Sequence, residues 1–551
     1  MISPRVRLAR WLLMLGLLAT PGVAAAEASL TERVLILANS DDPDSLRIAR
    51  HYAEVRRVPN GNIIALKLPV AETITWREFV TALWQPLLHQ LVSAKWIDAI
   101  PMDLTDVVGR RKYAPHAHRI AALVVCRGVP LKISHDPALY AESLPFTSRG
   151  EFRTNAGAVD AELSLLAIPN YPINAFVPNP LFQNHRPTPV ELAQVVKVSR
   201  LDAPTAEQAM ALVDHAVAAE RTGLLGRAYV DLSDRDPVGN GWLQDVAKQL
   251  RALDYDLSVD AEPGTFPAPA RMDAPVLYFG WYAGDLNGPF ALPGFRFPAG
   301  AIALHIHSYS AATLRSTTSG WTGPLIARGA TATVGNVHEP YLQFTHQPHL
   351  FLRALARGDT LVDAAYYALQ ALSWQAVLIG DPLYRPFGVP LEQQLRHRSN
   401  LPPLLAGYAV LRRMNELDAA GRSAEAITFG LGAQRDAPSL PLTVALGRRF
   451  QNAGEMNAAA DVLGFVPRLK SFATDEWGLA REACQLLEGT GRPAGAVATW
   501  RTIFANEKLP RELRIAWLPD ARRAALAARD FAQAAIWERE LDALTALPVG
   551  R

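Results

Sequence analysis

Cysteine is scarce in this sequence, with only Cys126 and Cys484 among 551 residues. There is no C-x-x-C pair and no His/Cys spacing typical of zinc ligands, so the sequence predicts neither a redox dithiol nor a metal site. The two cysteines lie in segments of different character. We therefore expect two unpaired, buried thiols rather than a disulfide.

A charge excess of one sign is also lacking, because 55 Lys and Arg residues balance 53 Asp and Glu residues. This balance gives no reason to expect binding to nucleic acid or to an anionic membrane surface. Beyond the amino terminus no apolar run is long enough to span a bilayer, so we expect no membrane span in the mature chain. No cofactor is predicted.

The first 26 residues have the order of a secretory signal peptide. Basic residues precede a short apolar core, and small residues follow it: Arg5, Arg7 and Arg10, then 11–18, then Ala24, Ala25 and Ala26. The apolar core is too short to cross ~30 Å of hydrocarbon, which argues against a membrane anchor. We expect residues 1–26 to be removed and the mature protein to be exported, to the periplasm or the outside.

Short apolar runs alternate with helical patterns between residues 31 and 390, which predicts an α/β fold with a parallel sheet. The expected strands are 34–39, 63–66, 120–125, 195–198, 228–232, 276–279, 301–307 and 330–337. We divide this part into an amino-terminal subdomain, 31–190, and a second subdomain, 191–390. The first contains an irregular insertion, 134–186.

The insertion carries one helix-like island with two acidic residues, Asp160 and Glu162. They could form a metal or substrate pair. Acidic residues also favour the first turn of a helix, where they complement the helix dipole. We prefer this second interpretation.

From residue 404 to 551 the chain becomes rich in Ala and Leu, with helical patterns and no predicted strand. Four weak repeats, each predicted as helix, tight turn and helix, have their turns at Gly421, Gly454, Gly491 and Asp530. The spacing is close to the ~34-residue tetratricopeptide period. Arrays of this kind offer a concave surface to a protein or peptide, so we expect such a partner here.

The stretch from Pro275 to Val337 is predicted to contain the functional site. It reads as strand, polar-aromatic loop, strand, a helix beginning in Ala-Ala-Thr-Leu-Arg-Ser (311–316), a further helix and a third strand. Polar groups at the ends of adjacent parallel strands are where an open α/β sheet forms a binding site.

Several segments resemble an uncharacterised family of exported bacterial proteins, found in species that carry the membrane enzyme exosortase. The resemblance covers about residues 33–387 and rests on VLILANSDDPDSLRIARHYAEVRRVPNGNII, VVCRGVPLKI, VDAELSLL, GWYAG, GAIALHIHSYSAATLRS, GPLIARGATATVGNVHEPYL and LIGDPLYRPF. It implies a link to protein sorting and exopolysaccharide but names no reaction.

The order of elements, with ARGATATVGNV and IGDPLYRPF, also resembles the gingipain peptidases of the caspase-like clan. This resemblance implies a two-subdomain fold in which a catalytic His follows one strand and a nucleophilic Cys ends the next. Here Gly280-Trp281-Tyr282 stands at the first position, and Ser308, or less well Ser310, at the second. We therefore expect the fold without cysteine-peptidase chemistry.

Three functional hypotheses remain open. In the first, a peptide or glycan binds a pocket lined by Trp281, Tyr282, His305, His307, Asn336, Glu339 and Tyr341. In the second, the protein is a hydrolase that uses Ser308 or Asp285 with His338 or His346. In the third, the α/β part is a scaffold, and the helical repeats dock a partner in envelope assembly.

Overall fold

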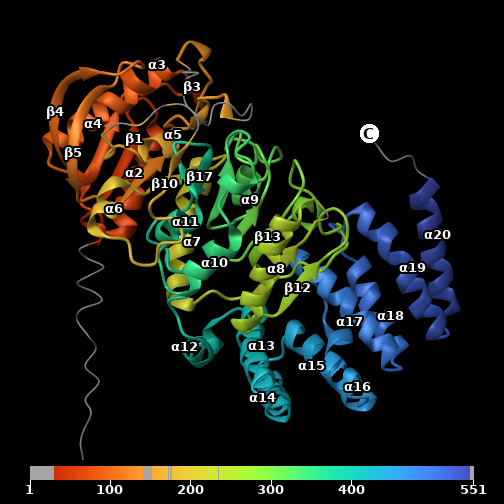
Figure 1. The fold of residues 1–551 in the computed structure, drawn as a ribbon. Coiled ribbons are helices and arrows are strands. Elements are labelled where there is room, and N and C mark those ends of the chain that lie inside the picture. The colour runs from red at the N-terminus through yellow and green to blue at the C-terminus, as the bar shows by residue number, and fades with distance from the viewer. Residues whose placement is uncertain are drawn as a thin grey trace, which may run out of the picture.

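The computed structural model describes residues 30–139, 152–169, 171, 173, 176–233 and 235–546. The predicted signal peptide and part of the predicted insertion lie outside these ranges. The described chain is a mixed α/β part, whose sheets are mostly parallel, followed by a carboxyl-terminal part made of helices (Figure 1). This confirms the predicted α/β class and the change to helices.

A six-stranded sheet has the order β15-β17-β10-β6-β1-β2. Its strands are β1 (Val34–Asn39), β2 (Ile63–Leu66), β6 (Ala122–Cys126), β10 (Val198–Leu201), β15 (Thr333–Asn336) and β17 (Ala376–Ile379). All neighbours are parallel except β15 and β17. Residues from the predicted second subdomain thus complete the sheet that β1 begins.

The predicted strand 195–198 was misplaced, since β10 starts only at Val198. Val196 is fully buried, and its N–H donates to the carbonyl of Ser164 rather than to a neighbouring strand. A buried apolar residue need not belong to a strand, and apolar runs alone do not locate strand ends.

A four-stranded parallel sheet has the order β12-β11-β13-β14. Its strands are β11 (Arg227–Asp231), β12 (Leu257–Asp260), β13 (Pro275–Gly280) and β14 (Ile302–His305). A parallel bridge between Ile302 and Ala332 joins β14 to the residue before β15. Because β15 is antiparallel to β17, the strands of this sheet end at the edge opposite to the carboxyl ends of β1 and β6.

Helices pack against both sheets: α2, α5 and α7 against the first, α8 against the second. The helices of this part are α2 (Pro43–Arg56), α3 (Trp76–Glu78), a π-helical turn (Phe79–Trp84), α4 (Gln85–Ser93), α5 (Val159–Leu163), α6 (Pro189–Gln194), α7 (Ala206–Thr222), α8 (Pro237–Ala252), α9 (Thr322–Ala327), α10 (Pro348–Ala356), α11 (Leu361–Ala368) and α12 (Leu391–Arg396). The predicted capping box is present, with Glu78 N–H donating to Thr75 Oγ1 at 3.2 Å.

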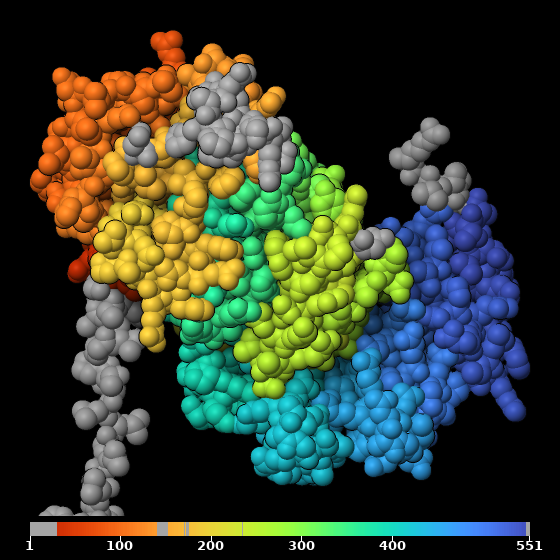
Figure 2. All heavy atoms as spheres, in the orientation of Figure 1, coloured from red at the N-terminus to blue at the C-terminus, as the bar shows by residue number. Residues whose placement is uncertain are grey.

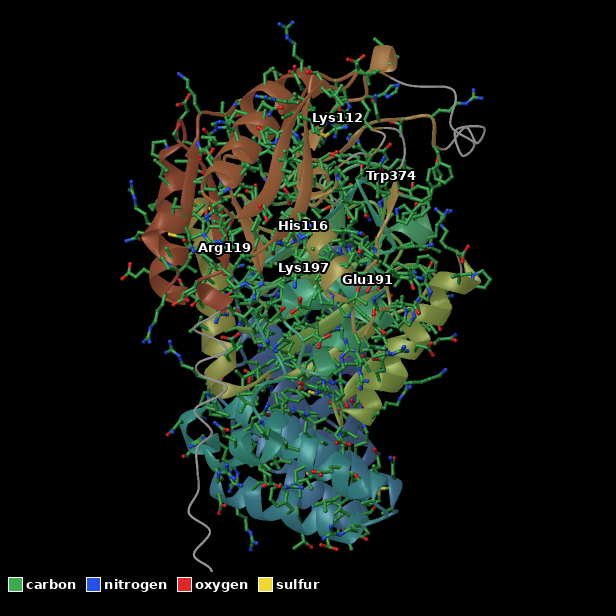
Figure 3. The ribbon with its side chains drawn as sticks, turned by 60° about the vertical axis from the view of Figure 1, so that its left-hand side comes forward. Lys112, His116, Arg119, Glu191, Lys197 and Trp374 are labelled. Carbon is green, nitrogen blue, oxygen red and sulfur yellow. The ribbon has the colours of Figure 1, made fainter. Side chains whose placement is uncertain are left out.

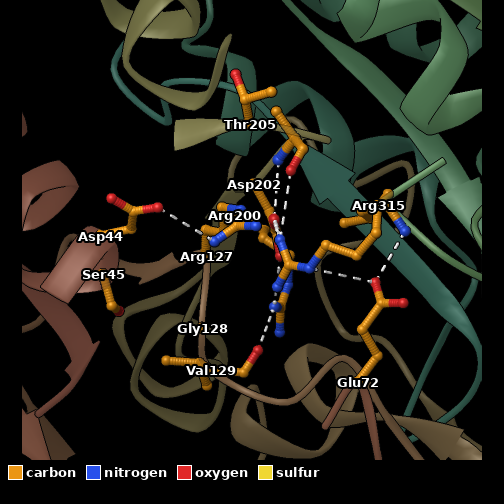
Figure 4. Close-up of polar contacts among 12 residues, drawn as sticks. Asp44, Ser45, Glu72, Arg127, Gly128, Val129, Arg200, Asp202, Thr205 and Arg315 are labelled. Carbon is orange, nitrogen blue, oxygen red and sulfur yellow. Dashed lines mark hydrogen bonds and ion pairs between the residues drawn. The ribbon is translucent and has the colours of Figure 1, made fainter. Parts of the chain in front are cut away.

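The predicted helix at 311–316 is wrong, because this segment is a loop bound to distant residues. Glu72 accepts hydrogen bonds from the Thr313 hydroxyl at 2.6 Å and the Leu314 N–H at 2.9 Å. The Arg315 guanidinium reaches the buried carboxylate of Asp202 (Figure 4). These contacts hold the loop against the amino-terminal half of the chain and outweigh local helix propensity.

Asp160 and Glu162 lie in the first turn of α5, as the preferred interpretation predicted, and each also binds a partner outside this helix. Asp160 binds Arg200, whose side chain has no exposed surface, and Glu162 accepts from the Tyr171 hydroxyl at 2.9 Å. Each carboxylate thus compensates the burial of a polar or charged partner.

An antiparallel hairpin of β4 (Ile97–Thr105) and β5 (Arg111–His118) projects from the amino-terminal half. It was not predicted, because each strand contains a proline, Pro101 or Pro115, and a proline within a run argues against a strand. Figure 3 shows Lys112, His116 and Arg119 following β5 and its end.

The carboxyl-terminal part consists of four helix pairs. They are α13 (Pro403–Ala419) with α14 (Ser423–Asp436), α15 (Leu440–Asn452) with α16 (Met456–Leu463), α17 (Trp477–Gly489) with α18 (Pro493–Phe504), and α19 (Arg511–Ala527) with α20 (Phe531–Ala546). Gly421, Gly454 and Gly491 take positive φ at the first three turns, as a left-handed helix cap requires. At the fourth, the positive φ belongs to Arg529 rather than Asp530.

Candidate functional site

The candidate site lies where β13 and β14 end beside β15. Two connections cross this edge: the loop 281–286 after β13 and the turn 307–310 after β14. The strand-end polar groups singled out in the sequence are the last residues of β14 and β15, or stand on these connections or after β15. Their contacts decide which of them can meet a ligand.

His305, the last residue of β14, belongs to a buried chain of hydrogen bonds. The Ala283 N–H donates to its Nε2 at 3.0 Å, which leaves the proton on Nδ1. Nδ1–H donates to the Tyr278 hydroxyl at 2.9 Å, and this hydroxyl donates to Asp231 Oδ2 at 3.3 Å. Burial, with a smaller effect of His307, lowers the pKa of His305 well below its usual value, so the ring is neutral.

The loop after β13 is fixed by the same cluster. The Trp321 ring stacks on His305 with centroids 3.5 Å apart, and its N–H donates to the Ala283 carbonyl at 2.8 Å. Asp285 Oδ1 accepts from the Gly320 N–H at 2.6 Å. His305 and Asp285 therefore shape this loop, and neither contacts a candidate nucleophile.

Asp231, at the end of β11, is the residue that the sequence reasoning missed. It has no exposed surface, its Oδ1 has no partner among the described residues, and burial raises its pKa to about 7. Gly280 leaves no room for a Cβ beside Tyr278 and Asp231. The available signal was a carboxyl group directly after the apolar run 228–230, in the strand adjacent to β13.

Trp281 faces away from this cluster. Its ring packs against Gly239 of α8, where a Cβ would collide with it, and its N–H donates to Asn240 Oδ1 at 2.9 Å. With only 3% of its surface exposed, Trp281 does not share a cleft with His305.

Tyr282 and His307 do come together at the partly exposed surface of this edge. Their ring centroids are 4.3 Å apart, and the Arg235 guanidinium lies 4.8 Å from the Tyr282 ring. The His307 Nδ1–H donates to the Ser308 carbonyl, and its Nε2 has no hydrogen-bond partner among the described residues. Tyr309, 52% exposed, extends the same turn.

Asn336 and the two serines fix the turn after β14 and form no catalytic pair. Asn336 Nδ2 donates to the His307 carbonyl at 3.2 Å and to Thr345, while the Asn336 N–H donates to Ser310 Oγ. Neither the Ser308 hydroxyl nor the Ser310 hydroxyl is hydrogen-bonded to a histidine ring in the described part of the chain.

The residues after β15 lead away from the edge. Glu339 accepts from the Tyr341 N–H at 3.1 Å, and the Tyr341 ring packs on Phe152. Burial lowers the pKa of His338, and that of His346 to about 3. Within the described ranges, no three His, Cys, Asp or Glu side chains are grouped to hold a metal ion.

Both cysteines are buried free thiols, as predicted. Cys126 ends β6, whose carboxyl end lies at the edge opposite to the candidate site, and burial raises the pKa of its thiol. Cys484 lies in α17, in the core of the helical part. Burial outweighs the opposing charge of Arg200 on the pKa of Cys126 and of Arg481 on that of Cys484, and a thiol kept protonated is a poor nucleophile.

The predicted ligand-binding residues thus separate into a partly exposed pair, Tyr282 and His307, and buried or distant ones. None of them lines any of five cavities in the described part of the molecule.

The chain matches no known protein family, no curated protein and no solved structure. None of its described helices combines the length and apolarity needed to cross a membrane.

Proposed function

We propose that this is an exported binding or assembly protein with a gingipain-like α/β part that lacks peptidase chemistry. The observation that carries the proposal is the state of His305: both of its ring nitrogens are engaged in buried hydrogen bonds. A histidine in this state cannot take a proton from a nucleophile. The resemblance to proteins of exosortase-carrying species suggests a role in envelope sorting or exopolysaccharide export.

The proposed ligand-binding surface is the partly exposed pair, Tyr282 and His307, at the ends of β13 and β14. Tyr282, with His307 and Arg235 beside its ring, presents an aromatic side chain next to His307 Nε2. Aromatic surface beside polar groups suits a glycan or an extended peptide. The helix pairs, proposed as tetratricopeptide-like repeats, add a second surface for a protein partner.

The proposal is tested first by assays of the purified mature chain on peptide and ester substrates, with and without chelator. We expect no hydrolysis above buffer. The proposal would be contradicted by hydrolysis that a thiol alkylator blocks and that is lost in Cys126→Ser.

Binding is tested on glycan and peptide arrays with Tyr282→Ala and His307→Ala. We expect each to weaken binding of the ligands selected by the unmodified chain by about fivefold or more, since one aromatic contact contributes about 1 kcal/mol. Phe531→Ala is the control, because it removes an exposed aromatic ring remote from this edge. Equal binding by all three variants would place the ligand elsewhere.

A second candidate, a hydrolase, is favoured by one observation. His307 Nε2 is held as an acceptor at the open edge and could activate water. In that case His307→Gln abolishes turnover, whereas Ser308→Ala leaves it unchanged.

A further inference from the structure

In the helical part, a groove opens between α14 and α16. It has a volume of about 560 Å³, and Leu431, Val462 and Phe465 contribute its partly exposed apolar surface. In Figure 2, the α13–α14 pair (cyan) and the α15–α16 pair (blue) form neighbouring bulges at the lower edge of the molecule. The groove therefore lies on the outside, away from the candidate site of the α/β part.

Helix packing explains why this space stays open. Both α14 and α16 pack against α15. Residues of α14 and α16 form the two walls of the groove. The apolar side chains between them meet each other only in part. A segment inserted there would remove this surface from water, at about 25 cal/mol for each Å² buried.

The rim of the groove is positively charged. Arg435, in the last turn of α14, and Arg468, just after α16, have no ion-pair or hydrogen-bond partner among the described residues. Some arginines of the helical part are paired, as Arg449 is with Asp418 at 2.9 Å, whereas others, such as Arg539, share with Arg435 and Arg468 the lack of an ion pair among the described residues. Asp461 is the one acid among the described residues that line the groove.

We propose that this groove docks an acidic amphipathic helix of a partner protein. Apolar side chains spaced at i, i+3, i+4 and i+7 contact Leu431, Val462 and Phe465, and carboxylates flanking them pair with Arg435 and Arg468. The charges select the partner and accelerate encounter, while the apolar contact supplies most of the affinity. The inference rests on the proposed function, in which the helix pairs meet a protein.

The experiment uses the full mature chain and two fluorescein-labelled model helices with the same leucine stripe. One carries Glu on its polar face and the other carries Lys. By fluorescence anisotropy at low salt, we expect the Glu helix to bind about tenfold tighter than the Lys helix. Added salt should weaken binding of the Glu helix, because the charged contacts are solvent-exposed.

Two variants locate the binding. Arg435→Glu with Arg468→Glu should weaken binding of the Glu helix by about tenfold or more and strengthen binding of the Lys helix. Val462→Asp should weaken both. Arg539→Glu, at an exposed position of α20, is the control for a charge reversal outside the groove and should leave both affinities unchanged.

Three results would overturn the inference: no saturable binding of the Glu helix at millimolar concentration, equal affinity for both helices, or equal loss in Arg539→Glu. Binding to phosphatidylglycerol vesicles without peptide binding would assign the arginines to lipid instead. If the Glu helix does not bind and the chain shows no hydrolase activity, only the inference about the groove is rejected. If the chain hydrolyses a substrate, the proposed function is rejected, and the inference about the groove still stands.

Discussion

Asp231 is buried at the end of β11, and this burial raises its pKa to about 7. The ordinary value is about 3.9, so between about pH 4 and pH 7 the folded state holds a proton that the unfolded chain has released. The free energy of unfolding therefore falls as pH rises through this window, by up to about 1.4 kcal/mol per pH unit. The buried network is most stable in acid.

Asp231→Asn removes this titration and should flatten the pH dependence. We expect its Tm to exceed that of the unmodified chain more at pH 8 than at pH 5, measured by differential scanning fluorimetry. Asp103→Asn, at an exposed position, is the control. A Tm difference that is the same at both pH values would show that Asp231 is ionised in the folded protein.

The two thiols offer a second test at the residue scale. Burial raises the pKa of both Cys126 and Cys484, so a thiol reagent such as dithionitrobenzoate should not react with the folded chain. In denaturant both thiols should react. Rapid labelling of one thiol under native conditions would reveal an opening of the fold around it, and Cys126→Ser would identify which.

Among the helical elements, the turns between paired helices differ in which residue takes the positive φ: glycine in the first three turns and arginine in the last. Gly491 has φ +74°, and a Cβ there would meet no atom within 4 Å, so Gly491→Ala is opposed by the backbone conformation alone. We expect it to lower the free energy of unfolding by about 1 kcal/mol.

Arg529 stands at the equivalent place in the last turn, with φ 59°. Arg529→Gly should therefore raise stability, by a few tenths to about 1 kcal/mol, as measured by urea unfolding. If both substitutions destabilise the chain equally, the turns do not share this conformation.

At the scale of the whole molecule, the helical part is docked on the α/β part through a buried polar network. Arg271 contacts Asp273, donates to the Tyr408 hydroxyl at 2.8 Å and to Glu482 at 2.9 Å. Tyr408, from α13, in turn donates to Asp273, which has no exposed surface. The two parts should consequently unfold together.

Tyr408→Phe removes a donor from the buried Asp273 carboxylate, at a cost of about 1–3 kcal/mol. We expect calorimetry to show one transition for the full chain and a lower Tm for this variant. Tyr309→Phe, which alters an exposed hydroxyl, should leave the Tm unchanged. Two separate transitions, with only one shifted, would show that the parts are energetically independent.

Features determined by neighbours in the chain were predictable from the sequence. The run Val34–Asn39 is a buried strand, Thr75 and Glu78 form the capping box, and glycines end the first helices of three pairs. Each depends on residues a few positions apart, where propensity, capping and apolar spacing act directly.

The candidate site depended on tertiary structure, because its contacts join residues distant in the chain. His305 meets Tyr278 only through the register of β13 with β14, and Asp231 only through that of β11 with β13. The segment 311–316 has helical propensity, yet Glu72 and Asp202 bind it as a loop. The sequence alone determined the elements and their polar ends. Strand pairing and burial decided which side chains are enclosed and which remain open to a ligand. Pairing and burial depend on contacts between distant residues, which no local pattern encodes.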